Sequence, residues 1–215
     1  MSFESHEPAK LSYISNVHSS ANRQGLTVLN HRRFYGDETE RRKWQNPETI
    51  LAAIGLKPGF TFIDVGCGEG FFAVPAAKIV GQKGRVFALD LDQDAITELK
   101  KKAAREDLKN LDAVVGGAED TVFCEACADI VFFGIVLHDF SIPAKVLAYA
   151  KTMLKPAGRL VDLDWKKELT DFGPPLQIRF SEEQASSLIR EAGFRIEQTK
   201  QAGPSHYIII ATHRA

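Results

Sequence analysis

The segment Phe62-Ile63-Asp64-Val65-Gly66-Cys67-Gly68-Glu69-Gly70 decides the fold of this chain. Its first four residues continue an apolar run from Phe60, which predicts a short buried strand. Glycines then form a loop, and the apolar run from Phe71 to Val80 predicts a helix behind it. Because glycine has no Cβ, such a loop lets the backbone approach a ligand closely. At the carboxyl end of a parallel strand, this arrangement binds nucleotide-like ligands.

The alternation of strand and helix continues along the chain. It predicts strands at 60–65, 85–90, 111–115, 129–135 and 159–163, and helices at 48–54, 71–80, 92–106, 142–154 and 181–192. Such alternation indicates an α/β fold with a parallel sheet covered on both faces. The last two strands, 194–200 and 206–212, are only five residues apart and must pair antiparallel. We therefore expect a doubly wound, Rossmann-like sandwich with a seven-stranded, mostly parallel sheet and an antiparallel C-terminal strand.

Length and composition limit the class of protein. The chain has 215 residues, 44% of them hydrophobic, and a formal net charge of −1. The charge argues against a dedicated nucleic-acid binder. No apolar run approaches the ~20 residues needed to span a membrane, and the first residues lack a signal-peptide layout, so we expect a cytoplasmic protein that does not bind membranes. The sequence leaves the oligomeric state open.

Two segments are expected. Residues 47–215 carry the regular pattern and form the main domain, whereas residues 1–46 are polar and only weakly periodic. One interpretation of the basic and aromatic residues at 31–35 and 40–44 is that they form a helical lid over the ligand. A solvated charged face is the alternative.

Acidic residues accompany the glycine loop. Asp64 precedes it and is placed to order the loop or to face a cation. Asp90 ends the second predicted strand, 24 residues after Gly66, where a carboxylate accepts hydrogen bonds from a ribose diol. The segment Gly117-Ala118-Glu119-Asp120 follows the third strand, where an adenine edge would be contacted. NAD is the competing ligand, but its motif needs a small residue where bulky Phe71 stands.

On these residues the chain resembles the class I methyltransferases that depend on S-adenosylmethionine (SAM), over about residues 47–212. Asp64 to Gly70 resembles the first motif of the family, and Asp90 its ribose-binding acid. Gly117-Ala118-Glu119 resembles its adenine-contacting segment, although Gly117 stands where Asp is common, and Leu154 to Leu160 resembles its turn before the fifth strand. The resemblance implies SAM as cofactor, with contacts at Asp64, Gly66, Cys67, Gly68, Asp90, Leu91, Ala118, Glu119 and Gly134.

Methyl transfer requires alignment of the acceptor and exclusion of water. His138, after the fourth predicted strand, is the candidate base or acceptor contact, with Asp139 to orient it. A histidine that only hydrogen-bonds backbone at the strand end is the alternative. Asp164, after the fifth strand, is the second catalytic candidate. It either faces the acceptor or pairs with Lys166 or Lys167.

Other candidates are weaker. Arg179 either meets an anionic acceptor or belongs to a rigid surface connection, and Trp165 either packs or stacks on the acceptor. Cys124 and Cys127 form a Cys-x-x-Cys at the amino edge of the sheet, away from the glycine loop. With three cysteines in the chain, neither a disulfide framework nor a metal site is expected.

The leading hypothesis is a SAM-dependent methyltransferase that acts on a small molecule. A methyltransferase of protein or RNA is the first alternative, and a SAM-binding module without catalysis is the second. An NAD-dependent oxidoreductase is a more distant one.

Overall fold

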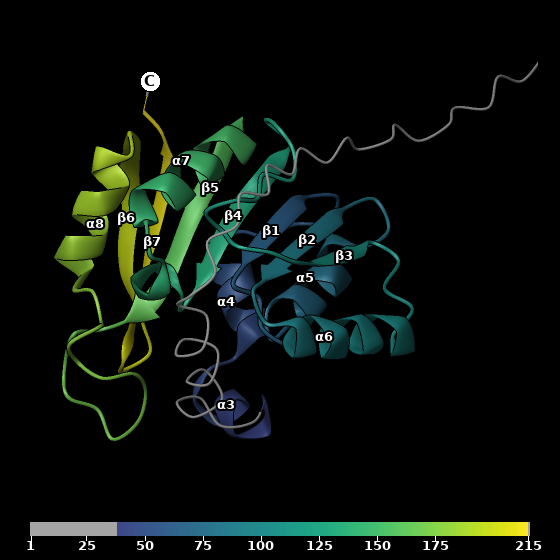
Figure 1. Ribbon diagram of the computed structural model, residues 1–215, viewed down its shortest axis with the longest axis horizontal. Helices are drawn as coiled ribbons and strands as arrows, with labels where there is room; N and C mark the ends of the chain where they lie inside the picture. Colours follow the sequence, from purple (N-terminus) through teal and green to yellow (C-terminus); the bar gives the residue numbers. More distant parts are fainter. Residues whose placement is uncertain (1–37, 215) are drawn as a thin grey trace, which may run out of the picture.

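A computed structural model describes residues 38–214 and contains one seven-stranded sheet in that range (Figure 1). The strand order is β3-β2-β1-β4-β5-β7-β6. Strand β7 runs antiparallel to both β5 and β6, and the other pairs are parallel. The strands are β1 (Thr61–Val65), β2 (Arg85–Asp90), β3 (Leu111–Val115), β4 (Ala128–Gly134), β5 (Leu154–Trp165), β6 (Phe194–Ala202) and β7 (His206–His213). The predicted fold class and terminal hairpin are confirmed.

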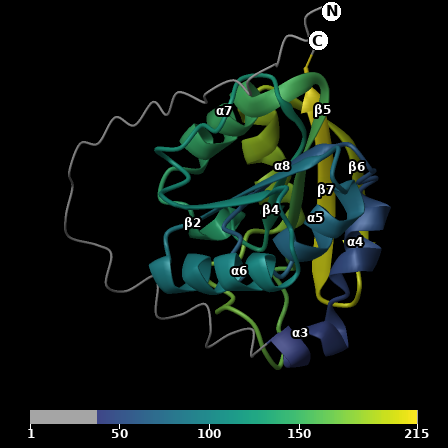
Figure 2. The same cartoon turned by 90° about the vertical axis from the view of Figure 1, so that its right-hand side faces the viewer.

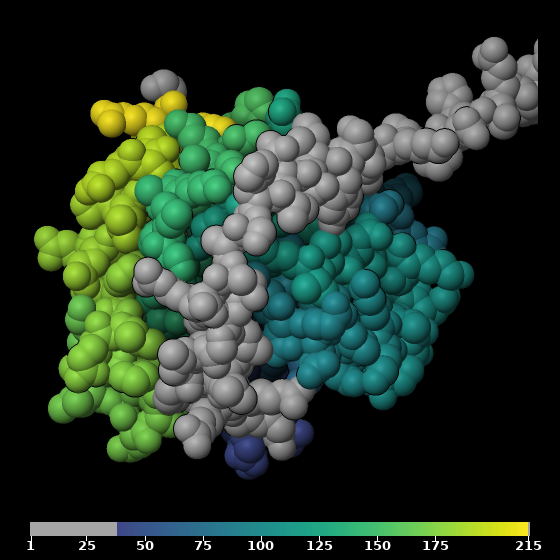
Figure 3. All heavy atoms as spheres, in the orientation of Figure 1, coloured from purple at the N-terminus to yellow at the C-terminus, as the bar shows by residue number. Residues whose placement is uncertain are grey.

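Helices cover both faces of the sheet, as Figures 1 and 2 show. Helices α4, α5 and α6 pack on one face and α7 and α8 on the other, so two apolar clusters form. Figure 3 shows α6 and α8 on opposite sides of the molecule. The helices are α3 (Glu38–Trp44), α4 (Pro47–Ala53), α5 (Ala73–Val80), α6 (Gln93–Arg105), α7 (Pro143–Met153) and α8 (Glu182–Glu191), with a 3-10 helix, η1 (Leu137–Asp139). Within residues 38–214, no helix is both long and apolar enough to cross a membrane.

Side-chain caps explain where several helices begin. Asn46 accepts a hydrogen bond from the Thr49 amide at the start of α4. Asp92 caps α6, and Ser181 caps α8 in a reciprocal capping box. Each cap satisfies amides that have no partner within the helix. These caps agree with the predicted starts of α6 and α8.

Strand β5 differs from the prediction. The sequence predicts a helix to Leu154, a turn over 155–158 and a strand over 159–163. Instead α7 ends at Met153 and the strand begins at the next residue. A Cβ at Gly158 would lie 2.7 Å from the Ala128 carbonyl oxygen, so glycine here permits close pairing with β4 rather than a turn. The register between β4 and β5 shifts at this point.

The parallel register brings the carboxyl ends of β2, β1 and β4 together. Val65 lies beside Leu89 on one side and beside Phe133 on the other. The loops that follow these three strands therefore meet at one edge of the sheet, where ligands bind in open α/β sheets.

Candidate functional site

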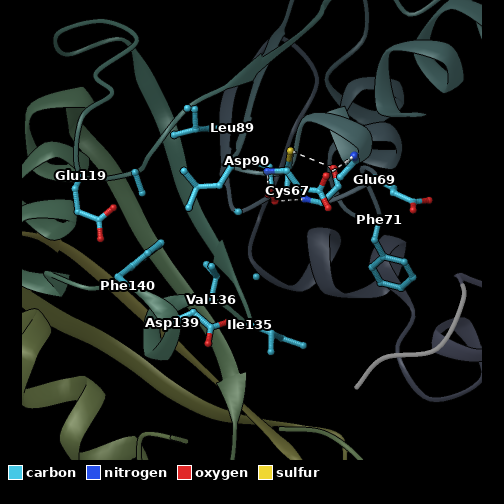
Figure 4. Close-up of a pocket in the computed structure, with 18 of the residues that line it drawn as sticks. Cys67, Glu69, Phe71, Leu89, Asp90, Glu119, Ile135, Val136, Asp139 and Phe140 are labelled. Atoms are coloured by element: carbon cyan, nitrogen blue, oxygen red, sulfur yellow. Dashed lines mark hydrogen bonds between the residues drawn. The ribbon is translucent and has the colours of Figure 1, made fainter. Parts of the chain in front are cut away.

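A cavity of about 680 Å³ lies at this edge, within the ~300–1,000 Å³ range of small-molecule sites (Figure 4). Among residues 38–214, six acidic side chains and two basic ones line it, a balance that favours neutral or cationic ligands. The charged lining residues are Glu38, Arg41, Glu69, Asp90, Asp92, Lys102, Glu119 and Asp139.

The glycine loop forms one wall of the cavity. The amides of Gly66 and Cys67 donate to the Leu89 carbonyl at 2.7 and 3.0 Å, which ties the loop to β2. Gly66 has φ +75°, and a Cβ there would lie 2.6 Å from Val136. Gly68 has φ +52°, but a Cβ there would meet no atom of residues 38–214 within 4 Å. The space at Gly68 is thus open for a ligand to approach the backbone.

Asp90 closes the other side of the glycine loop. One carboxylate oxygen accepts a hydrogen bond from the Gly68 amide at 2.7 Å, and the other accepts from the Asp92 amide at 2.9 Å. A carboxylate has about four acceptor positions, so both oxygens retain capacity for a ligand. The geometry suits recognition of a vicinal diol.

The segment after β3 forms the opposite rim. Ala118 and Leu91 line the cavity, and the Leu91 side chain is exposed. Glu119 also lines it, but its carboxylate accepts hydrogen bonds from the amides of Ser141 and Ile142 at 3.0 and 3.4 Å. Glu119 therefore holds the β3 loop against the start of α7.

Asp64 lies behind the loop rather than on the cavity surface. Its side chain is buried, and the burial, with the charge of Asp90, raises its pKa to about 7 despite the opposing charge of Arg41. One carboxylate oxygen has no hydrogen-bond partner among the described residues. Asp64 is thus placed to order the loop from beneath.

Comparison with known proteins identifies the fold. A family model described as "Methyltransferase domain" matches residues 56–195. A solved SAM-dependent methyltransferase from Aquifex aeolicus is 30% identical, with a TM-score of 0.76, over 81% of this chain and 97% of that one. The chain belongs to the class I SAM-dependent methyltransferases. The predicted family, and with it the family's methyl donor, is confirmed.

Curated methyltransferases resemble the chain over part of their length. The demethylmenaquinone methyltransferase of Bacillus mycoides is 27% identical over 125 residues, which are 58% of this chain and 52% of that protein. The nocamycin O-methyltransferase of Saccharothrix syringae is 30% identical over 112 residues, which are 52% of this chain and 40% of that protein. The chain thus spans about half or less of these relatives.

The predicted cofactor contacts of this methyltransferase lie close together. All of them except Asp64 line the cavity: Gly66, Cys67, Gly68, Asp90, Leu91, Ala118, Glu119 and Gly134. Cys67 is buried in the loop, and burial raises the pKa of its thiol well above the usual value, which disfavours a reactive thiolate.

The two catalytic candidates are paired with each other instead of facing the cavity. His138 Nδ1 lies 2.8 Å from Asp164 Oδ2, and both side chains are fully buried. Asp164 is therefore not paired with Lys166 or Lys167, and it holds the ring at Nδ1 because it lies inside β5 beside the end of β4. The predicted neighbour Asp139 lies on the other side of the ring, with Oδ1 3.6 Å from His138 Nε2.

Several residues that line the cavity lie outside the predicted cofactor contacts, among them Arg41 and Ile135. Arg41 of α3 belongs to the segment 40–44, for which a lid was one interpretation, and its guanidinium lies 4.0 Å from the centre of the Phe71 ring. Ile135 follows β4 with φ +67°, a conformation that β-branched residues rarely adopt. Its amide donates to the Leu163 carbonyl at 2.7 Å, which holds it there. Ile135 stands in no recognisable motif.

The N-terminal segment is described only from residue 38. Helix α3 lies at the cavity through Glu38 and Arg41, and Lys102 Nζ bonds both Glu38 and the Glu69 carbonyl at 3.0 and 3.1 Å. The basic and aromatic residues at 31–35 lie outside the described range.

The loop between β5 and α8 is rigid. Buried Arg179 donates to the carbonyls of Pro174, Lys166 and Glu168 and to the Thr170 hydroxyl, at 2.8–3.2 Å. This favours the interpretation of Arg179 as part of a surface connection rather than an anion contact.

An aromatic cluster joins this loop to α3. Fully buried Trp165 contacts Trp44, Phe172 and His206, with ring centres 4.1–5.6 Å apart. Trp44 also stacks on His206 in nearly parallel planes. Trp165 therefore packs inside this aromatic cluster, which is one of the two interpretations that the sequence allowed.

His206 makes the stability of this methyltransferase sensitive to acid. Burial, together with the charges of Arg41, Arg179 and Lys166, lowers the pKa of His206 from 6.5 to about 3. Because the pKa is lower in the folded chain, the unfolded chain binds a proton at His206 at a higher pH than the folded chain does. The free energy of unfolding therefore decreases as the pH falls below 6.5. We expect losses of up to ~1.4 kcal/mol per pH unit between pH 6.5 and 4.

Urea denaturation at pH 7, 6 and 5 tests this expectation. His206→Phe keeps an aromatic ring and should flatten the pH dependence. His213→Phe, at the other end of β7, is the control and should behave like the wild type. Equal pH dependence in wild type and His206→Phe would contradict the assignment.

The sequence leaves the role of Cys124 and Cys127 open. The two are joined as a disulfide, a single local bridge and not a disulfide framework. The Ala126 and Cys127 amides of the same loop donate to the carbonyls of Thr152 and Met153 at 2.9 Å. The pair precedes β4 and lies outside the cavity, as predicted. Among residues 38–214, no group of three or more metal-ligating side chains is present.

Proposed function

We propose that this chain transfers a methyl group from SAM, bound in the cavity, to a small-molecule acceptor. The observation that carries the proposal is the cavity itself, which joins the open backbone at Gly68, the carboxylate of Asp90 and the rim at Ala118. SAM supplies an electrophilic methyl group on a positively charged sulfur, which the acidic lining suits. The relatives that act on demethylmenaquinone and nocamycin support a small acceptor.

We further propose roles for the protein around the cavity. Gly66, Cys67 and Gly68 lie against the amino-acid part of the cofactor, Asp90 holds the ribose, and Ala118 contacts the base. Leu91, Glu119 and Gly134 complete the surface, and Asp64 supports the loop. Helix α3 covers one side of the cavity as a lid, an assignment supported by Glu38 and Arg41 in the cavity lining.

Ligand-induced stabilisation tests the choice of cofactor. SAM and S-adenosylhomocysteine, each at about 100 times its Kd, should raise the Tm by roughly 5–10 °C, because binding at that excess adds ~2.7 kcal/mol to stability. NAD should leave the Tm unchanged because Phe71 stands where its motif needs a small residue. Differential scanning fluorimetry measures all three. Stabilisation by NAD alone would overturn the cofactor assignment.

Turnover separates the enzyme from a binding module. S-adenosylhomocysteine release should be measured with SAM and a panel of small phenols, quinols and amines. A protein that binds SAM but releases no S-adenosylhomocysteine with any acceptor, including protein and RNA, would fit the binding module.

A further inference from the structure

Helix η1 divides its side chains between the cavity and the core. Asp139 lines the cavity with 21% of its side chain exposed, whereas the side chain of His138, one residue earlier, is fully buried. Figure 4 shows Asp139 on the same wall as Ile135 and Val136. The polar group that this turn presents to the cavity is therefore a carboxylate and not an imidazole.

His138 links that carboxylate to a second one in the core. Its Nδ1 lies 2.8 Å from Asp164 Oδ2, and its Nε2 lies 3.6 Å from Asp139 Oδ1. The other oxygen of Asp164 accepts the Trp165 amide at 2.7 Å, which fixes the carboxylate in β5. Asp164 thus holds the ring through Nδ1, while Nε2 faces Asp139 at ion-pair distance and has no hydrogen-bond partner among the described residues.

This arrangement favours a protonated ring. Burial alone would lower the pKa of His138, but the carboxylates of Asp164 and Asp139 outweigh it and raise the pKa, with Arg179 acting in the opposite direction. An imidazolium donates from both nitrogens and cannot act as a base. It does stabilise the ionised form of the carboxylate beside it.

We infer that Asp139 is the residue that contacts the methyl acceptor, with His138 and Asp164 as the positioning residues that hold it. The inference rests on the proposed methyltransferase function. It limits the acceptor to a molecule whose nucleophilic atom carries a hydrogen, a hydroxyl or an amine, because a carboxylate on the wall accepts a hydrogen bond from such a group. A carboxylate acceptor is repelled by Asp139.

The chemistry balances with the groups present. The oxygen or nitrogen of the acceptor gains the bond to the methyl carbon, the electron pair of the broken carbon–sulfur bond stays on the sulfur, and the proton that the acceptor loses passes to Asp139. Asp139 is thus a hydrogen-bond acceptor before transfer and a proton acceptor after it.

The first experiment follows His138 by nitrogen-15 NMR during a pH titration. Asp139→Asn and Asp164→Asn should each lower the pKa of His138, since each removes a neighbouring negative charge that favours the imidazolium. Asp171→Asn, an exposed acid in the β5–α8 loop, is the matched control and should leave it unchanged. An unaltered His138 titration in Asp139→Asn would overturn the link.

The second experiment measures acceptor binding directly. With S-adenosylhomocysteine bound, phenol and benzylamine serve as probes, and their Kd is measured by NMR. Asp139→Asn should weaken the binding of at least one probe by about tenfold, as expected for one charged hydrogen bond, and leave the Kd for S-adenosylhomocysteine unchanged. Asp139→Glu, which keeps the carboxylate, should recover part of the loss.

The outcomes distinguish the two proposals. Equal probe binding by wild type and Asp139→Asn, or no probe binding by the wild type, would overturn the role of Asp139 and leave the methyltransferase function standing. Failure of the wild type to bind S-adenosylhomocysteine would overturn the proposed function instead.

Discussion

Replacement of Asp90 by alanine should weaken SAM binding by at least about 100-fold. The carboxylate lies at the end of β2, and each of its oxygens already accepts one backbone amide, from Gly68 and Asp92. If its remaining acceptor positions bind the ribose hydroxyls, the substitution removes two charged hydrogen bonds of ~1.5–3 kcal/mol each. It also releases the Gly68 amide, so the glycine loop loses one of its hydrogen bonds to β2 and keeps those from Gly66 and Cys67 to Leu89. Isothermal titration calorimetry with SAM and with S-adenosylhomocysteine measures the change.

Two further variants make the Asp90 experiment specific. Asp94→Ala removes an exposed acid from the first turn of α6, outside the cavity, and should leave the affinity unchanged. Asp90→Asn keeps one oxygen that accepts hydrogen bonds, so its Kd for SAM should lie between those of the wild type and Asp90→Ala. An unchanged Kd in Asp90→Ala would refute the ribose assignment.

Replacement of Gly66 by alanine should lower the Tm by roughly 5–15 °C. Its φ of +75° costs an L-residue about 1–2 kcal/mol, and the new methyl group would lie 2.6 Å from Val136. Overpacking of this kind costs ~1–3 kcal/mol, and each kcal/mol moves the Tm by ~2–4 °C in a domain of this size. Thermal unfolding followed by circular dichroism measures the loss.

Neighbouring positions separate the two causes of this loss. Val136→Ala combined with Gly66→Ala removes the clashing methyl groups and should restore part of the Tm, leaving the backbone term. Gly68→Ala meets no atom of the protein, so it should cost only the backbone term of ~1–2 kcal/mol while it abolishes tight SAM binding. A Gly66→Ala protein as stable as the wild type would contradict the close packing against Val136.

Much of the fold could be predicted because its signals are local. Apolar runs of five to seven residues mark β1 and β4, and the capping residues Asp92 and Ser181 mark the starts of α6 and α8. The gap between the last two strands, five residues as predicted and three in the structure, excludes a crossover helix, so the reversed strand follows from chain length alone. Strand β5 was predicted too short because Pro156 and Gly158 are typical of turns, and only pairing with β4 shows that they lie in a strand.

The parts of the candidate site that belong to a sequence motif could be predicted. The parts that depend on pairing between residues far apart in the sequence could not. The glycine loop and Asp90 were found because their spacing follows one strand–helix–strand unit. His138 and Asp164 are 26 residues apart in sequence, and their pairing depends on the register of β4 and β5. Arg41 reaches the cavity from α3, outside the main sheet. Its segment, 40–44, allowed either a lid or a solvated charged face, and the sequence alone does not decide between them.

The left-handed conformation of Ile135 is backbone strain that the surrounding core maintains. The conformation costs about 1–2 kcal/mol, but the side chain is 2% exposed and packs in the core behind the cavity wall. Replacement by glycine would relieve the strain and lose the buried side chain, which costs ~2–5 kcal/mol, so the exchange should destabilise the protein. A library for heat resistance should therefore hold residue 135 fixed and vary the helices on the far side of the sheet.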